Sequence, residues 1–374
     1  MNKRFSKFYK TYNHLLLIIK KIIYCIFSKK YQIFDFFEHN NYILVSYLLL
    51  RKGKKSGHQS KFIPQLIIRA SKKTGLNLII VDYRAKPVKF TNKNIIMILG
   101  IEPNFELYSK IYRMAFKIYY ATGSYQDYQN HQVTTRTDAF NKHYSSNIPY
   151  RRLQEYHQSL SYADEILTVG TEFTAKTYPQ EFHQKFKFIK EPINPLFRDG
   201  LTSKTNRFYR NDFIFFAGGG NILKGLDLVI EAFLKRSDLK IYIVTSIEND
   251  IFKIFEDALN SSNNIVVVGY LENNSEQLKR ILENVSFSIL PSCSEGTPGS
   301  ILQLMQYGIV PIVSRNAMIE NEYLTEKLGI MIEELTVDSL IKSIDEAVKM
   351  DLEFKKKKAL LCERFLKYNH TEEA

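Results

Sequence analysis

The sequence of 374 residues contains no tryptophan, no internal repeat and no low-complexity tract. Its three cysteines, Cys25, Cys293 and Cys362, are scattered and form neither a CxxC pair nor a disulfide framework. This pattern is typical of a protein in a reducing cytosol, and we interpret Cys293 as a small space-filling thiol. The lack of tryptophan gives no support for base stacking and no nucleic-acid-binding motif occurs, so nucleic acid is not an expected partner.

The composition indicates a globular protein with more than one domain. Apolar residues make up 45% of the chain, and phenylalanine and tyrosine occur 26 and 24 times, so a disordered chain is excluded. A chain of this length suits two domains that each bury a core. Proline and polar residues indicate a hinge near 192–208. The predicted parts are a basic segment (residues 1–30), a first domain (31–195), a second domain (208–350) and a last helix (351–374) that crosses back onto the first domain.

Charge is unevenly spread along the chain. Residues 1–93 contain 20 lysines and arginines but only three acidic residues, a net charge of +17, whereas residues 201–374 have a net charge of −5. A basic half predicts an anionic partner, which could be nucleic acid, an anionic membrane leaflet or a phosphate-bearing acceptor. Of these partners, the N-terminal pattern favours the membrane.

The first 30 residues have the pattern of a basic amphipathic helix. Apolar residues recur at helical spacing on one face, and basic and polar residues gather opposite them: Leu15, Ile19, Ile22 and Ile26, with Lys10, Asn13, His14, Lys20 and Lys21. The stretch is interrupted, is too short to span a bilayer, and lacks the cleavage site of a signal peptide. It predicts either peripheral attachment to the inner face of the cell membrane or an ordinary surface helix.

Residues 286–315 contain the most specific pattern, which is a strand, a loop, a helix and a second strand. The apolar run that Pro291 ends predicts a buried strand. Small residues and one carboxylate, Glu295, fill the loop, and apolar residues at helical spacing follow until Gly308. The first turn of such a helix has free N–H groups that bind anions. The predicted ligand-facing neighbours of Glu295 are Ser294, Gly296, Thr297, Pro298, Gly299 and Ser300.

A second glycine-rich loop precedes this pattern in the sequence. Residues 213–217 predict a strand, residues 226–234 predict a helix, and between them lie Gly218, Gly219, Gly220, Asn221 and Lys224. Glycines allow the backbone to approach a bulky anion, and the lysine adds a mobile positive charge. Both loops are predicted to follow strands of one sheet, and this strengthens a phosphate-site hypothesis that neither loop supports alone.

Together the two loops resemble the donor-sugar signature of retaining, nucleotide-sugar-dependent glycosyltransferases of the GT-B fold. These are the group 1, or family 4, enzymes of bacterial glycan and lipopolysaccharide synthesis. The resemblance rests on the S-x-x-EG loop, the helix that ends in glycine, the strand VPIVSR and the GGG-x3-KG element. It implies an α/β protein with two Rossmann-like domains, each a parallel sheet with helices on both faces, that face a cleft. The first domain would bind the acceptor and the second the nucleotide-sugar donor.

The resemblance implies roles for individual residues, with two departures. In the family pattern Glu-x7-Glu the first glutamate faces the donor sugar and the second binds the ribose, whereas this chain has Glu295 and then Gln303. Glutamine still forms hydrogen bonds with ribose hydroxyls. Gly219 or a neighbour replaces the family's diphosphate-binding arginine, so Lys224 would carry more of the charge unless Arg315 or a basic residue of the first domain substitutes. The family's nucleobase-binding position corresponds here to Gly269, Tyr270 and Leu271.

The first domain has weaker candidates, which are expected on the acceptor side. Gly57 and His58 follow a predicted strand, where ligands bind in parallel sheets, although such a pair is often only a turn. Gly123 and Ser124 follow another predicted strand, at a point where related enzymes approach the donor sugar. Arg136 lies in a basic segment that suits either a phosphate-bearing acceptor or a solvated helix face.

The resemblance implies transfer of a hexosyl or related group from a nucleotide-diphosphate sugar to a glycan or lipid-linked saccharide. Transfer builds negative charge on the departing diphosphate, and Lys224 and the amides of residues 296–300 are the candidates that stabilise it. Glu295 is expected to orient sugar hydroxyls and not to act as a nucleophile. The resemblance implies that the anomeric configuration is retained. No Asp-x-Asp motif occurs, so neither a metal nor another cofactor is expected.

Two other classes of function remain open from the sequence. The altered arginine and glutamate positions are compatible with a catalytically inactive GT-B subunit that binds a partner glycosyltransferase. A nucleotide-sugar epimerase or a sugar phosphorylase would share the fold, but no epimerase signature or pyridoxal-binding pattern occurs in the sequence.

Overall fold

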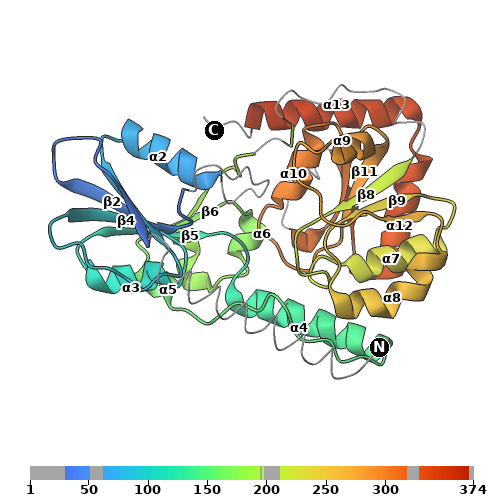
Figure 1. Cartoon of the computed structure of the whole chain (residues 1–374), viewed down its shortest axis with the longest axis horizontal. Coiled ribbons are helices and arrows are strands. Elements are labelled where there is room, and N and C mark those ends of the chain that lie inside the picture. The colour runs from blue at the N-terminus through green and yellow to red at the C-terminus, as the bar shows by residue number, and fades with distance from the viewer. Residues whose placement is uncertain (1–29, 51–61, 194–195, 198–210, 318–327, 370–374) are drawn as a thin grey trace, which may run out of the picture.

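The computed structural model describes residues 30–50, 62–193, 196–197, 211–317 and 328–369 and contains two α/β domains side by side (Figure 1). The predicted N-terminal amphipathic helix, and with it Cys25, lies outside the described residues, as do Gly57 and His58. Within the described ranges, no helix is both long enough and apolar enough to cross a bilayer.

The N-terminal domain is built on a seven-stranded sheet with the order β1-β3-β2-β4-β5-β6-β7. Its strands are β1 (Tyr31–Phe34), β2 (Asn41–Tyr47), β3 (Asn77–Asp82), β4 (Asn94–Gly100), β5 (Phe116–Ala121), β6 (Glu165–Thr168) and β7 (Phe186–Phe188). Its helices are α2 (Ile63–Lys73), α3 (Asn104–Ile111), α4 (Gln126–His143), α5 (Ser159–Tyr162), α6 (Glu172–Ala175) and the 3-10 helix η2 (Gln180–Lys185). Edge strand β1 is antiparallel to β3, and every other pair is parallel.

The C-terminal domain is built on a six-stranded sheet with the order β10-β9-β8-β11-β12-β13, in which every pair is parallel. Its strands are β8 (Asp212–Phe216), β9 (Ile241–Val244), β10 (Ile265–Val267), β11 (Val285–Leu290), β12 (Val310–Ser314) and β13 (Ile330–Ile332). Its helices are α7 (Leu226–Lys235), α8 (Asn249–Ser261), α9 (Glu276–Leu282), α10 (Gly299–Met305), α12 (Val337–Lys349), α13 (Leu352–Asn369) and the 3-10 helix η4 (Arg315–Ala317).

The strand order of the C-terminal sheet positions the candidate site. From β8 the chain first adds β9 and β10 on one side and then returns to place β11 on the other, which is the doubly wound order of dinucleotide-binding domains. The carboxyl ends of β8 and β11 therefore flank the point where the order reverses, and ligands bind at such points. Both glycine-rich loops follow these two strands, so the predicted Rossmann-like architecture is confirmed.

Aromatic packing holds these two strands together. All six residues of β11 are buried, because a central parallel strand is covered on both faces. Phe287 on β11 stacks on Phe213 of β8 with ring centroids 5.3 Å apart, and Phe233 of α7 meets Phe213 edge-on at 5.2 Å. Such ring pairs contribute about 0.5–1.5 kcal/mol beyond the area they bury. The strands that carry the candidate site are thus rigidly supported.

Helix α4 connects the two domains. It follows β5 of the first sheet, yet Phe140 and the later Ile148 belong to the hydrophobic core of the C-terminal domain. The Tyr144 hydroxyl, at the end of α4, donates a hydrogen bond to Glu231 Oε1 on α7 (2.6 Å). Figure 1 shows α4 extending alongside α7 and α8. A helix of the first half of the chain is therefore a structural part of the second domain.

The last helix, α13, packs on the C-terminal domain over its described length. Cys362, Phe365 and Leu366 lie in the core of that domain, and α13 contacts α10 and β12. The predicted crossing onto the first domain involves the end of the chain, of which residues 370–374 lie outside the described part, and it stays a prediction.

Candidate functional site

The two glycine-rich loops of the C-terminal domain pack directly against each other. Cys293 N donates a hydrogen bond to Leu223 O (2.8 Å), and Ser292 Oγ donates to the same oxygen (3.0 Å). Gly225, with φ +74°, ends the first loop, and a Cβ there would lie 2.3 Å from Pro291 O. Only glycine permits this approach of the two backbones. The loops therefore form one surface at the carboxyl edge of the sheet.

Lys224 and Glu295 form an ion pair across these loops. Their side chains are only 14% and 13% exposed, so the pair is largely shielded from water. Ser292 Oγ donates a further hydrogen bond to the same carboxylate oxygen, Glu295 Oε1 (2.8 Å). The structure thus brings together the two residues predicted to be catalytic, a cation and a carboxylate that are 71 positions apart.

The N-terminal domain contacts the Glu295 loop at its own carboxyl edge. A Cβ on Gly296 would lie 2.5 Å from Thr122 O, and Gly123 packs against the Gly296 amide. Ser124 Oγ and Ser294 Oγ share a hydrogen bond, and Thr297 Oγ1 donates to Val169 O. Gly123 and Ser124, predicted on the acceptor side, therefore lie next to the predicted donor loop. The site is formed between the two sheets.

Arg136 is largely covered and paired with a buried carboxylate, although the sequence suggested an exposed role for it. Its Nη2 lies 2.6 Å from Asp227 Oδ2 in the first turn of α7, and the two side chains are 13% and 4% exposed. Burial raises the pKa of Asp227, and the nearby Arg136 charge opposes this shift without cancelling it. A guanidinium committed to a buried carboxylate is not displayed to a phosphate-bearing acceptor, so its geometry favours an interdomain structural role.

The glycine loop has an open part and a covered part. A Cβ on Gly218 or Gly219 would meet no atom within 4 Å, whereas Gly220, with φ +91°, lies beneath the Arg152 side chain. Asn221 is fully buried and holds the loop, because its Nδ2 donates to Ser246 O (3.3 Å) and its Oδ1 accepts from Glu248 N (2.7 Å). Asn221 therefore positions the loop, and the first two glycines leave room for a ligand.

The remaining predicted donor residues are more widely spread. Pro298 precedes α10, which begins with Gly299 and Ser300, and Gln303 is a buried residue of this helix. Gly269 adopts φ +82° after β10, Tyr270 is 67% exposed, and Leu271 packs against a separate apolar cluster. An exposed tyrosine beyond the carboxyl end of a strand is accessible for stacking on a planar base.

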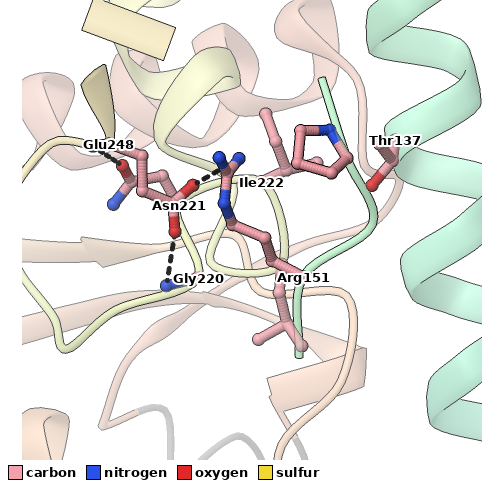
Figure 2. Close-up of a pocket in the computed structure, with 8 residues that line it drawn as sticks. Thr137, Arg151, Gly220, Asn221, Ile222 and Glu248 are labelled. Atoms are coloured by element: carbon pink, nitrogen blue, oxygen red, sulfur yellow. Dashed lines mark hydrogen bonds and ion pairs between the residues drawn. The ribbon is translucent and has the colours of Figure 1, made fainter. Parts of the chain in front are cut away.

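A small pocket that was not predicted from the sequence lies beside the glycine loop. It is lined by Thr137, Pro149, Arg151, Gly220, Asn221, Ile222, Leu223 and Glu248 (Figure 2). Glu248 Oε1 accepts from Gly220 N (3.2 Å), and its Oε2 lies 3.3 Å from Arg151 Nη1. Arg151 also pairs with Asp250. Burial alone would raise the pKa of the Asp250 carboxyl, but the hydrogen bond and the charge of Arg151 outweigh burial, so the pKa is lowered. Only the run of basic residues near 151 could have indicated this contact.

Cys293 is buried behind the site. Its side chain is fully covered, and burial raises the pKa of its thiol to about 12. At pH 8 about one thiol in ten thousand is then a thiolate, which is the reactive form. We therefore expect iodoacetamide at pH 8 to alkylate Cys293 at least about 100-fold more slowly in the folded protein than in urea. Peptide mass mapping measures both rates, and fast labelling of the folded chain would contradict the observed burial.

The comparisons with known proteins agree with this geometry. Residues 199–361 match the family model described as glycosyl transferases group 1. Comparison with curated protein sequences gives no significant match. Among solved structures, a sucrose-phosphate synthase from Thermosynechococcus elongatus superimposes with a TM-score of 0.62 and 11% sequence identity, over 90% of this chain and 96% of that one.

Two other solved structures have similar scores. WaaG, a glycosyltransferase involved in lipopolysaccharide biosynthesis, has a TM-score of 0.55 and 11% identity, over 88% of this chain and 95% of that one. Alr3699/HepE from Anabaena, in complex with UDP and glucose, has a TM-score of 0.56 and 11% identity, over 89% and 96%. The likenesses extend over both domains and show the fold, which is the predicted GT-B fold.

Proposed function

We propose that this chain, whose residues 199–361 match the model of the glycosyl transferases group 1 family, moves a hexosyl group from a nucleotide-diphosphate sugar to a saccharide acceptor. The observation that carries the proposal is the shielded pair of Lys224 and Glu295 between two glycine-rich loops. The pair lies at the order reversal of the donor-side sheet, against Gly123 of the other domain. A glycan or lipid-linked saccharide of the cell surface is the proposed acceptor.

The chemistry needs a fixed positive charge beside the departing diphosphate. Groups that stabilise charge developing in the transition state act strongly where water is excluded. The Lys224 ammonium supplies such a charge, and its ion pair holds it at the loop before substrate binds. When the donor binds, the Lys224 ammonium exchanges its contact with Glu295 for one with a phosphate oxygen. The Glu295 carboxylate is then free to accept hydrogen bonds from the sugar hydroxyls. The backbone N–H groups of Gly296 and Thr297 in the loop, and of Gly299 and Ser300 in the first turn of α10, add hydrogen-bond donors; Pro298 between them has none.

The donor sugar, its nucleotide and the stereochemistry belong to the same proposal. The solved structure of HepE contains UDP and glucose, so UDP-glucose is the first donor to test. We propose that Gln303 binds the ribose, that Tyr270 stacks on the base, and that the anomeric configuration is retained. We also propose that no metal takes part in the reaction, because the sequence has no Asp-x-Asp motif.

The test is incubation of the purified chain with radiolabelled UDP-, GDP- and ADP-sugars, with and without saccharide acceptors. Nucleotide release that depends on an acceptor, and that is unchanged by EDTA, is the expected result. Nucleotide binding with no release under any condition would favour the inactive partner-binding subunit. Release without an acceptor would point to another reaction, and loss of activity in EDTA would refute metal independence.

We further propose that residues 1–30 attach the enzyme to the inner face of the cell membrane. The proposal rests on the basic amphipathic pattern of these residues, since the structure does not describe residues 1–29. We expect the full chain to sediment with vesicles that contain about 30% anionic lipid, more strongly at low salt, and a chain lacking residues 1–30 to stay in the supernatant. Equal sedimentation of the two chains would contradict it.

A further inference from the structure

We propose that Arg152, from the N-terminal half of the chain, binds the diphosphate of the donor in place of the arginine that the glycine loop lacks. This inference rests on the proposed function and names one more residue of the same site. The loop of residues 217–225 contains a single cation, Lys224. A nucleotide diphosphate carries two or more negative charges, so a second cation beside this loop would match its charge.

Arg152 lies on the glycine loop. A Cβ built on Gly220 would be 2.7 Å from Arg152 Cγ, 3.3 Å from its Cδ and 3.7 Å from its Nε. The absence of a side chain at Gly220 is therefore what lets the arginine lie here. Lys224 N donates a hydrogen bond to Gly220 O (3.0 Å), and this bond closes a turn. Gly220, which contacts Arg152, begins the turn, and Lys224 ends it. The two cations thus flank the same turn.

The guanidinium of Arg152 is available, unlike those of its neighbours. Arg136 is bound to Asp227, and Arg151 is bound to Glu248 and Asp250. Arg152 is exposed, and within the described part of the chain its guanidinium forms no ion pair. An unpaired arginine beside an open stretch of glycine backbone can form the paired N–H···O contacts that phosphate oxygens accept.

The segment that bears Arg152 is held in place by α4. Gln129 Nε2 donates to Arg152 O (2.6 Å), and Asn130 exchanges hydrogen bonds with the backbone of Gln154 at 3.0 and 2.7 Å. Arg152 itself adopts φ +68°, a conformation that costs free energy for a residue other than glycine. The contacts of α4 maintain this conformation, so the side chain is oriented toward the loop before any ligand binds.

The experiment measures binding of UDP, GDP and ADP by calorimetry to the full-length chain and its variants. Arg152→Gly removes the charge and suits the positive φ, so it tests the charge without a strained backbone. We expect it to weaken binding of the preferred diphosphate roughly 10- to 100-fold, the range for losing a hydrogen bond to a charged group. Arg152→Lys keeps the charge but lacks the paired N–H groups of the guanidinium, so it should recover only part of the affinity that Arg152→Gly loses.

Two further variants make the test specific. Arg113→Gly is the control for the loss of one exposed arginine, because Arg113 precedes the amino end of β5, whereas the site lies at the carboxyl ends of the strands; its diphosphate affinity should equal that of the wild type. Arg315→Ala tests the competing cation that follows β12. Thermal melting of each variant shows whether it is folded.

The outcomes separate this inference from the proposed function. Wild-type affinity in Arg152→Gly, or a loss confined to Arg315→Ala, would overturn the role of Arg152 and leave the proposed function standing. Binding by Arg152→Lys that is no tighter than binding by Arg152→Gly would show that a positive charge at this position does not act on the diphosphate, and it would also overturn the role of Arg152. If the wild-type chain binds none of the three diphosphates, both the proposed function and this inference are wrong.

Discussion

Replacing Lys224 by alanine should lower the rate of glycosyl transfer at least about 100-fold, the usual cost of removing one group that stabilises transition-state charge. The Lys224 ammonium is the one cation in the glycine-rich loop of residues 217–225, and its ion pair with Glu295 already holds it in the proposed site. Most of the loss should be in kcat, because the charge on the diphosphate grows as the bond to the sugar breaks. Initial rates at saturating nucleotide sugar and acceptor measure the effect.

The partner residue supplies a control for this prediction. Glu295→Gln keeps the size of the side chain and its capacity to accept hydrogen bonds from sugar hydroxyls, but it removes the ion pair. We expect it to lose less activity than Glu295→Ala, which should be as inactive as Lys224→Ala. Circular dichroism should show a native fold in all three variants. Wild-type rates in Lys224→Ala and Glu295→Ala would show that the reaction takes place elsewhere.

Replacing Arg136 by alanine should lower the free energy of unfolding by about 3–5 kcal/mol. The substitution leaves Asp227, which is only 4% exposed, buried without its cation. Burial already raises the pKa of this carboxyl even with Arg136 present, so the loss of the arginine removes the main interaction that favours its charged form. Urea denaturation followed by circular dichroism measures the change.

Two companion variants show whether the lost pair is the cause. Arg136→Met combined with Asp227→Leu removes both charges, and it should recover most of the stability, because an apolar pair of similar volume often replaces a buried ion pair at little cost. Lys235→Ala, at the other end of α7, breaks an exposed pair with Asp338 and should change stability by less than about 1 kcal/mol. An effect of Arg136→Ala no larger than that of Lys235→Ala would contradict the importance of the buried contact.

Much of the donor side could be predicted from local sequence. The apolar run before Pro291 and the residues that follow it correspond to β11, the Glu295 loop and α10, and the run before Gly218 corresponds to β8. These elements follow from hydrophobic runs of strand length and from turn residues, which act over a few positions. The expectation that both loops lie on one sheet was also correct, since β8 and β11 are hydrogen-bonded neighbours.

The sequence by itself determined the alternation of strands and helices, the two glycine-rich loops and the presence of Lys224 and Glu295 within them. Only the tertiary structure decided which basic residues have free charges. It pairs Arg136 with the buried Asp227, pairs Arg151 with Glu248, and places the Arg152 side chain against Gly220. The reason is that strands and turns depend on near neighbours, whereas the partner of a charged side chain depends on packing between residues far apart in the chain. Here that packing was set by α4 crossing from one sheet to the core of the other domain.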